Sequence, residues 1–253
     1  MQTMSLQSGS NGNCIYVEAG ETRLLFDAGI TGRQAELRLL ARGRHIRECH
    51  ALFLSHDHSD HTSCAGVFHR RFGIPLFMTK GVYRTRRDRI GPVRPPTWFS
   101  PGDCVTIGDV RVQTIPTLHD GVDGVCFLVE HDGRRLGIFT DLGAPFLALG
   151  EALSRCHGAF LESNSDPQML ETGRYTDDLK RRIRGGHGHL SNVESADLSR
   201  GYATATLGWL ALAHLSEDNN TPALALETHQ QRGPALLPTI VASRYGPSEL
   251  LDV

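Results

Sequence analysis

The segment SHDHSDH, residues 55–61, places three histidines and two aspartates within seven positions, directly after the apolar run ALFL. The apolar run predicts a short buried strand. Because one residue separates His56 from His58, both side chains can point the same way from an extended or turning backbone. Asp60 and His61 follow as a second pair. Imidazole and carboxylate groups packed this closely would repel or titrate without a cation among them, so the segment predicts a metal site.

Three further ligand-type residues also follow predicted strands. His119 comes after VRVQTIPTL, Asp141 after LGIFT, and His214 after WLALA. The carboxyl ends of strands are where α/β proteins gather their sites, since the loops there converge without disturbing the sheet. Together with the first cluster, these residues give seven candidate ligands from four strand ends.

Strand and helix patterns alternate in both halves of the chain. The sequence predicts two strands joined by the turn AGET near the N-terminus and a hairpin over 124–141 that turns at HDGR. Helices are predicted over the following residues: 32–42, 62–73, 190–208 and 221–233. This order predicts an α/β fold in which two mixed sheets pack together under outer helices, a four-layer αββα sandwich. We expect a single domain over residues 1–253.

Composition limits the cellular setting of the chain. The residues are 40% hydrophobic and 21% charged, and no stretch approaches the ~20 apolar residues of a membrane span. The N-terminal residues lack the pattern of a secretory signal, so a cytoplasmic location is expected. Six cysteines without any C-x-x-C pair suit reduced, buried thiols. Nothing in the sequence specifies an oligomeric state.

Arginine is concentrated in two runs although the formal net charge is only -2. The runs are RTRRDRIGPVR, residues 84–94, and LKRRIR, residues 179–184. Either run can contact phosphates, and either can equally be a solvated helix face.

The seven candidate ligands and their order resemble the metallo-β-lactamase superfamily, whose signature H-x-H-x-D-H matches residues 56–61. The resemblance extends over nearly the whole chain and implies the metallo-β-lactamase fold. It also implies an assignment of ligands to two metal ions. The first ion would take His56, His58 and His119; the second would take Asp60, His61 and His214; and Asp141 would bridge the two.

Within that superfamily the chain resembles the YycJ (WalJ) branch. The motifs that carry this resemblance are SGSNGNC, SHDHSDH, LHDGVDGVCF, FTDLG, LESNSD, RYTDDLKRRI, GHLSN and LAHLSEDNNTPALAL. The branch is associated with 5′-to-3′ exonuclease activity on double-stranded DNA. This chain departs from the branch pattern E-S-N-H-D by carrying Ser165 in place of histidine, which removes support for a catalytic role at that position.

The expected chemistry is hydrolysis. Two cations about 3.5–4 Å apart can share a water and hold the bridging hydroxide as the nucleophile. Asp60 offsets the positive charge, and His189, in a Gly-flanked turn before a helix, is the candidate to assist the leaving group. His189 is also a candidate substrate contact. The other substrate-contact candidates are Ser163, Asn164, Ser191 and Asn192.

Two aspartates are candidates to orient ligand histidines through the second ring nitrogen, Asp27 and Asp57. Histidine and carboxylate ligands without thiolate suit two Zn²⁺ ions, while Mn²⁺ or iron is chemically reasonable.

Three functions are compatible with this set of residues. The first is a dinuclear phosphodiesterase or nuclease with DNA as its partner, expected to be a 5′-to-3′ exonuclease. The second is a small-molecule hydrolase acting on a lactone, thioester or cyclic phosphate, because the surrounding loops rather than the metal centre select the substrate. The third is a non-catalytic, metal-stabilised regulatory module, which is the least favoured.

Overall fold

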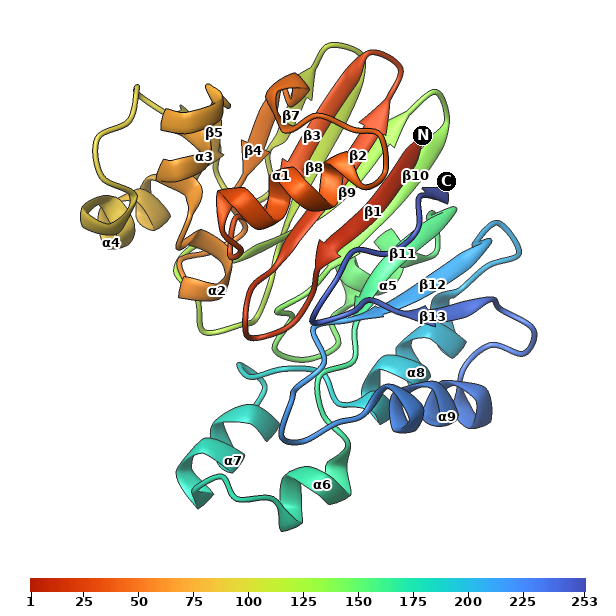
Figure 1. Ribbon diagram of the computed structural model, residues 1–253. Coiled ribbons are helices and arrows are strands. Elements are labelled where there is room, and N and C mark those ends of the chain that lie inside the picture. Colours follow the sequence, from red (N-terminus) through yellow and green to blue (C-terminus); the bar gives the residue numbers. More distant parts are fainter. The chain divides into compact units, whose positions relative to one another are not determined.

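The computed structural model describes all residues from 1 to 253 (Figure 1). The chain divides into two compact units. Unit 1 comprises Met1–Pro116, Gly121–Val125 and Ser243–Asp252, and unit 2 comprises Thr117–Asp120, Cys126–Ala242 and Val253. Each unit contains its own strands and helices. The expectation of a single domain over the chain stays a prediction.

Unit 1 contains a mixed sheet in the order β14-β1-β2-β3-β4-β5-β6, and also the antiparallel pair of β7 with β8. Its strands are β1 (Gln2–Gln7), β2 (Cys14–Ala19), β3 (Thr22–Phe26), β4 (Ala51–Phe53), β5 (Leu76–Met78), β6 (Thr97–Trp98), β7 (Cys104–Ile107), β8 (Val110–Pro116) and β14 (Leu251–Asp252). Its helices are α1 (Gly32–Leu40), the 3₁₀ turn η1 (Ile46–Glu48), α2 (Ser59–Thr62), α3 (Ala65–Phe72) and α4 (Lys80–Ile90). Strand β3 pairs antiparallel with β2 and parallel with β4, so the direction of pairing changes at β3.

Unit 2 also contains mixed strand pairing, in the order β13-β12-β11-β10-β9. Its strands are β9 (Val125–His131, of which Val125 falls in unit 1), β10 (Arg134–Phe139), β11 (Gly158–Glu162), β12 (Trp209–Ala213) and β13 (Thr239–Val241). Its helices are α5 (Leu147–Leu153), α6 (Pro167–Thr172), α7 (Asp177–Arg184), α8 (Asn192–Tyr202) and α9 (Pro222–Arg232). Strands β10, β11 and β12 are parallel, so their carboxyl ends open at one edge.

Apolar side chains fill the interior of each unit. In unit 1, the rings of Phe26 and Phe53 stack at 5.4 Å, and Phe77 continues the stack at 4.8 Å. In unit 2, Phe160 meets Trp209 edge to face at 5.5 Å, and α8 packs beside α9 (Figure 1). Burial of such rings is the main source of stability for each sheet.

Helix ends follow the capping signals that the sequence carries. Helix α3 ends at Gly73, whose φ of 80° is the left-handed conformation that glycine adopts without a Cβ clash. Helix α9 begins after the Thr221 cap with Pro222 in its first turn. The helix predicted over 190–208 is shorter than expected. It ends at Tyr202, where the backbone becomes extended at Ala203, and Thr204 and Thr206 then donate their hydroxyls to backbone carbonyls outside the helix.

The N-terminal strand β1 was not predicted. Its residues alternate polar and apolar side chains, yet nearly all of them are buried, and the strand pairs antiparallel with β2. Buried Thr3 satisfies its hydroxyl by donating to the carbonyl of Tyr16. A polar residue with such a partner is compatible with a core position, which the sequence pattern alone does not reveal.

No helix of the structure combines the length and the apolar character that crossing a membrane requires.

One buried histidine makes stability depend on pH. His229 in α9 is 3% exposed, and neither of its ring nitrogens has a hydrogen-bond partner. Burial lowers the pKa of His229 from 6.5 to about 4. The unfolded chain therefore binds a proton at this residue between these two pH values, while the folded chain does not.

We predict that His229→Leu makes the free energy of unfolding less dependent on pH between about 4 and 6.5. As pH falls from 6.5 to 4, the unmodified protein loses up to about 3 kcal/mol of unfolding free energy at this residue, at about 1.4 kcal/mol per pH unit. Urea unfolding of both proteins at about pH 7 and about pH 4.5, on either side of most of this titration, measures the difference. Equal losses of unfolding free energy in the two proteins would show that this pH dependence does not come from His229.

Candidate metal-binding residues in the two units

The predicted cluster of unit 1 lies in the loop after β4 and in the short helix α2. Helix α2 begins after its N-cap residue His58, so the motif changes from extended to helical backbone within its own length. The ring centroid of His56 lies 4.6 Å from that of His58 and 4.2 Å from that of His61. Three imidazoles therefore converge, with His56 and His61 buried and His58 half-buried.

Hydrogen bonds to Nδ1 fix two of these rings. Asp27 Oδ2 lies 2.7 Å from His61 Nδ1, and the hydroxyl of Ser55 lies 2.9 Å from Asp27 Oδ2 and 2.9 Å from His56 Nδ1. Since a carboxylate only accepts, His61 Nδ1–H donates to Asp27 and the Ser55 hydroxyl also donates to it. Ser55 in turn accepts from His56 Nδ1–H. Both rings thus carry their lone pair on Nε2, the form that binds a metal.

The left-handed backbone of Asp27 is part of this arrangement. Its φ is 63°, an uncommon conformation for a residue with a side chain. Asp27 Oδ1 accepts the backbone N–H of Ser55 at 2.8 Å, and the backbone N–H of Asp27 donates to the carbonyl of Phe53 at 2.8 Å. These bonds hold the carboxylate beside the histidines. The predicted role of Asp27 is consistent with its position.

Asp57 occupies a different position from the one expected. The hydrogen bond of its carboxylate is with the backbone N–H of Val122, 2.8 Å away, instead of with a ligand histidine. The expectation is corrected because the side chain of Asp57 turns toward the segment 121–125. That segment is tightly packed: a Cβ on Gly121 would lie 2.5 Å from the ring of His56.

Asn13 joins this cluster, although the sequence analysis did not single it out. Its Nδ2 lies 3.2 Å from Asp60 Oδ2 and 3.0 Å from His61 Nε2, and its backbone N–H donates to the Asp60 carbonyl at 2.8 Å. Gly29 makes this approach possible, because a Cβ there would lie 1.6 Å from the same carbonyl. The motif SGSNGNC contains Asn13, but the sequence pattern gives no indication that Asn13 reaches the cluster.

The three predicted ligands of unit 2 converge on Asp141. Asp141 Oδ1 lies 3.8 Å from His119 Nε2 and 3.6 Å from His214 Nε2. All three side chains are almost completely buried, and Asp141 and His214 both have a φ of 56° within two positions of a strand end. Strained residues of this kind concentrate at functional sites because the surrounding structure must hold them.

The backbone of unit 2 also fixes the His119 ring. The carbonyl of Gly188 lies 2.7 Å from His119 Nδ1, so Nδ1–H donates and Nε2 carries the lone pair. His214 is held differently, because Asn164 Nδ2 donates to the His214 carbonyl at 2.8 Å and lies 3.4 Å from its Nδ1. Asn164 thus contacts a predicted ligand.

Glu162 is a second residue that the sequence analysis missed. It is fully buried at the end of β11, and its Oε1 lies 2.7 Å from His189 Nδ1 and 3.4 Å from His214 Nδ1. Its Oε2 accepts the backbone N–H groups of Leu142 and Leu190. Burial raises the pKa of Glu162, but the charge of His189 and hydrogen bonds from His189 and His214 outweigh burial and lower the pKa to about 2.

His189 lies among these residues. Its ring centroid is 4.7 Å from that of His119 and 5.1 Å from that of His214, and its side chain is 17% exposed. Its Nδ1–H donates to Glu162, so Nε2 is the atom that can exchange a proton. The neighbouring His187 is exposed, and its Nδ1 donates to the carbonyl of Leu118.

The remaining substrate-contact candidates have structural partners. The Ser163 hydroxyl donates to Asn192 Oδ1 at 2.6 Å, both side chains are fully buried, and Asn220 completes the network. Ser191 caps α8 in a reciprocal capping box with Glu194. Ser165 forms an isolated bridge with Ser191. The contact role of Ser163, Ser191 and Asn192 stays a prediction, and their positions favour the support of neighbouring loops.

The donor atoms of unit 2 are close enough to share an ion. Four residues each offer one ligand atom, and these atoms lie within 4.8 Å of one another: Asp141, Glu162, His189 and His214. Both units offer imidazole and carboxylate donors at these sites, and hydrogen bonds to Nδ1 leave the lone pair of His56, His61 and His119 on Nε2. This donor set fits a divalent ion of the zinc, manganese or iron type.

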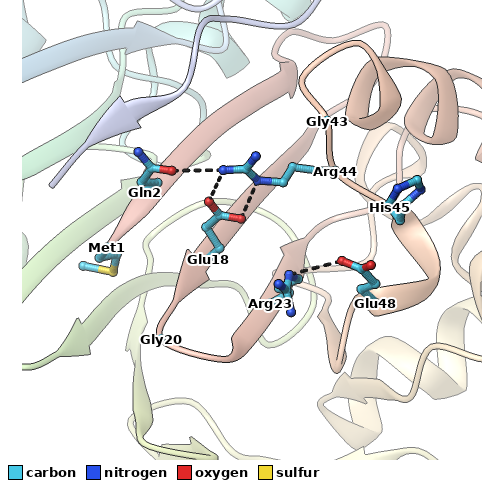
Figure 2. Close-up of a pocket in the computed structure, with 9 residues that line it drawn as sticks. All are labelled: Met1, Gln2, Glu18, Gly20, Arg23, Gly43, Arg44, His45 and Glu48. Carbon is cyan, nitrogen blue, oxygen red and sulfur yellow. Dashed lines mark hydrogen bonds and ion pairs between the residues drawn. The ribbon is translucent and has the colours of Figure 1, made fainter.

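A pocket in unit 1 contains none of the predicted ligands (Figure 2). It has a volume of about 350 Å³, and Figure 2 shows two ion pairs in its wall. Arg44 binds both carboxylate oxygens of Glu18, at 2.5 and 2.6 Å, and Arg23 lies 3.4 Å from Glu48. The charged side chains of this pocket therefore satisfy one another, which indicates a structural role.

Comparison with known proteins agrees with the predicted family. A family model described as the metallo-beta-lactamase superfamily matches residues 8–143. The chain is 32% identical over 222 residues to "Exodeoxyribonuclease YycJ" of Bacillus anthracis, with 87% of this chain and 84% of the relative covered. It is 30% identical over 228 residues to "Exodeoxyribonuclease WalJ" of Streptococcus pneumoniae, with 87% and 83% covered.

Solved structures share the fold at low sequence identity. Zn²⁺-bound PqqB from Methylobacterium extorquens has a TM-score of 0.74 and 17% identity, with 100% of both chains covered. The metallo-beta-lactamase fold protein YhfI from Bacillus subtilis has a TM-score of 0.72 and 14% identity, with 98% of both chains covered. At these identities the likeness concerns the fold alone, and it confirms the fold class predicted from the sequence.

We predict that Asp27→Asn weakens divalent-metal binding while Asp57→Asn does not. Asparagine at position 27 offers one acceptor oxygen where Asp27 receives three hydrogen bonds, so His61 loses its fixed ring orientation. Loss of such a bond typically costs about 10–100-fold in metal affinity. In Asp57→Asn the amide keeps an oxygen that can accept from the Val122 N–H.

Competition with a chromogenic chelator measures both affinities. The two variants make the same chemical change close to the same motif, so an effect of removing one negative charge from this region appears in both. Equal loss of affinity in both, or no loss in Asp27→Asn, would show that the Asp27–His61 bond does not support a metal.

Proposed function

This chain belongs to the metallo-β-lactamase superfamily, in the YycJ/WalJ branch, and from that premise we propose that it is an exodeoxyribonuclease that degrades DNA from the 5′ end. The protein is a metal-dependent hydrolase by membership of this family. The observation that carries the proposal is the set of buried histidines in each unit whose second ring nitrogen is held by a hydrogen bond. The names of the two relatives support DNA as the substrate.

We propose that the seven predicted ligands hold two divalent ions, with Zn²⁺ as the best match to their donor atoms. The residues are His56, His58, Asp60, His61, His119, Asp141 and His214. The bound ions would supply a nucleophile at neutral pH by lowering the pKa of water, and positive charge toward the phosphate oxygens. Asp60 and Asp141 contribute the negative charge that two ions need, and Asn13 orients Asp60 by donating to its carboxylate.

His189 is proposed as the residue that gives a proton to the leaving oxygen. Its Nδ1–H is bound to the buried Glu162, which fixes the ring and leaves Nε2 to carry the transferred proton. A carboxylate behind an imidazole also stabilises the protonated ring. Partial exposure allows the ring to meet a substrate, whereas the surrounding ligands are buried.

We predict that His189→Ala lowers kcat for DNA hydrolysis by a factor of about 100 or more, the usual contribution of a positioned acid. The variant should keep its metal content, because none of the seven predicted ligands is changed. Single-turnover cleavage of an end-labelled duplex measures the rate, and elemental analysis measures the metal.

His187→Ala is the matched control, because it removes an exposed histidine two positions away. A rate within a factor of two of the unmodified protein in His189→Ala, with metals retained, would remove His189 from the mechanism. Equal losses in the two variants would indicate damage to the loop.

We also predict that a chelator abolishes cleavage of the duplex and that Zn²⁺ or Mn²⁺ restores it. Metal-replete protein should release mononucleotides progressively from a 5′-labelled duplex before any internal fragment accumulates. Cleavage that survives complete metal removal would contradict the hydrolase assignment. Internal fragments as the first products would contradict only the exonuclease assignment.

A further inference from the structure

The two arginine runs of the sequence differ in their ion pairing. In α7, each arginine binds a carboxylate: Arg181 pairs with Asp178, Arg182 with Asp120 and Arg184 with Glu171. In α4, Lys80, Arg84 and Arg89 are exposed and make no ion pair with an acidic side chain. The positive charge of α4 is therefore available to an external anion, while that of α7 is largely compensated within the protein.

An aromatic pair lies beside the cations of α4. Trp98 at the end of β6 is 40% exposed, and its ring meets that of Tyr83 at 5.5 Å with an interplanar angle of 63°. Lys80 lies three positions before Tyr83 and four before Arg84, so the three side chains lie along one side of the helix. The edge contact from Tyr83 holds the indole while part of it stays open to solvent.

A pocket of about 260 Å³ opens at this indole. Polar side chains surround the aromatic surface, and the lining includes Thr79, Lys80, Trp98, Ser100, Asp103 and Asp123. Asp103 already accepts the N–H of Ser100, and Asp123 accepts the N–H of Gly81. These fixed carboxylates disfavour a phosphate inside the pocket but can accept from the amino group of a nucleobase. An aromatic face with such a rim fits a stacked base.

Two direct contacts join this region to the metal motif of the same unit. Val122 donates its N–H to Asp57, and the next residue, Asp123, lines the pocket. Arg86 of α4 donates its Nε–H to the hydroxyl of Thr62, the residue after His61. The pocket and the α4 cations therefore belong to the same packed region as the HDHSDH motif.

We infer that Trp98 and α4 form a binding surface for a DNA strand, with one base stacked on Trp98 and the strand's phosphates on Lys80 and Arg84. This inference rests on the proposed function, since it names how the substrate strand is held beside the metal motif of unit 1. The observations that carry it are the cations without acidic partners, the exposed indole and the pocket lined by Lys80 and Trp98.

The test measures, by fluorescence anisotropy, the binding of an oligodeoxycytidylate to the metal-replete full chain. The probe carries fluorescein and phosphorothioate linkages and is about 12 nucleotides long, within the span of one single-strand binding site, and its cytosines have the amino group from which Asp103 or Asp123 would accept. Phosphorothioate linkages slow cleavage during the titration. Trp98→Ala should raise Kd about tenfold, the usual effect of losing one stacked base, and should leave the salt dependence of binding unchanged. Trp98→Phe, which keeps an aromatic face, should recover most of the affinity.

Lys80→Ala/Arg84→Ala should lower the slope of log K against log salt by about 1.4, because each phosphate contact on a single strand contributes about 0.7. The control Arg181→Ala/Arg184→Ala removes the same number of charges from arginines that already pair with carboxylates, and should leave the slope unchanged. Equal slope changes in the two double variants would overturn the inference, as would a Kd in Trp98→Ala within twofold of the unmodified protein.

The proposed function is tested separately in the same preparation. Unmodified, metal-replete protein should hydrolyse bis(p-nitrophenyl) phosphate, a small ester that needs no strand-binding surface. If it does not, the phosphodiesterase proposal fails, while the pattern of Kd values and slopes still decides whether the surface binds a strand.

Discussion

The hydrogen bonds to histidine Nδ1 are the interaction on which the proposed chemistry depends. Asp27 binds His61, Ser55 binds His56, and the carbonyl of Gly188 binds His119. Each acceptor fixes the Nδ1–H tautomer of a buried ring, so the lone pair lies on Nε2. In a buried environment such a bond is both stronger and more costly to lose than it would be in water, so the fold supplies the ligand form before a metal arrives.

The backbone supports the same arrangement. Asp27, Asp141 and His214 all adopt a positive φ within two positions of the end of a strand. A left-handed residue there turns the chain sharply, so that a side chain at the strand end faces the predicted metal ligands of its own unit. The conformational cost is of the order of 1 kcal/mol each and must be offset by the packing and hydrogen bonding around them. These residues therefore place candidate metal-binding side chains at the ends of strands, where the sheet holds them rigidly.

The candidate ligands could be located from the sequence because their signal is local. Each predicted ligand follows an apolar strand pattern, and the strands were found where they were expected. Asn13 and Glu162 were missed because their contacts with His61 and His189 join residues 48 and 27 positions apart. Asp57 was assigned the wrong partner for a related reason, since its hydrogen bond goes to Val122 in a different segment. Neighbouring sequence does not specify such contacts.

The arginine runs show that the sequence also does not specify which charged residues form ion pairs in the folded chain. Both runs contain helical segments rich in arginine. The arginines of α7 pair with three acidic side chains, whereas cations of α4 are exposed beside the exposed indole of Trp98. The difference depends on tertiary position, which determines whether a charged helix face serves stability or remains available to a ligand. Family membership specifies a metal-dependent hydrolase, while surfaces of this second kind are where the substrate is selected.

The most direct measurement of the central claim is the tautomeric state of the histidines, read from long-range ¹H–¹⁵N correlation spectra of ¹⁵N-labelled protein with and without Zn²⁺. We expect that His56, His61 and His119 carry their proton on Nδ1 in both samples, and that Zn²⁺ shifts their Nε2 resonances more than their Nδ1 resonances. Protonation on Nε2 in the metal-free protein, or Zn²⁺-induced loss of the Nδ1 proton, would show that the fold does not preset these rings as metal ligands.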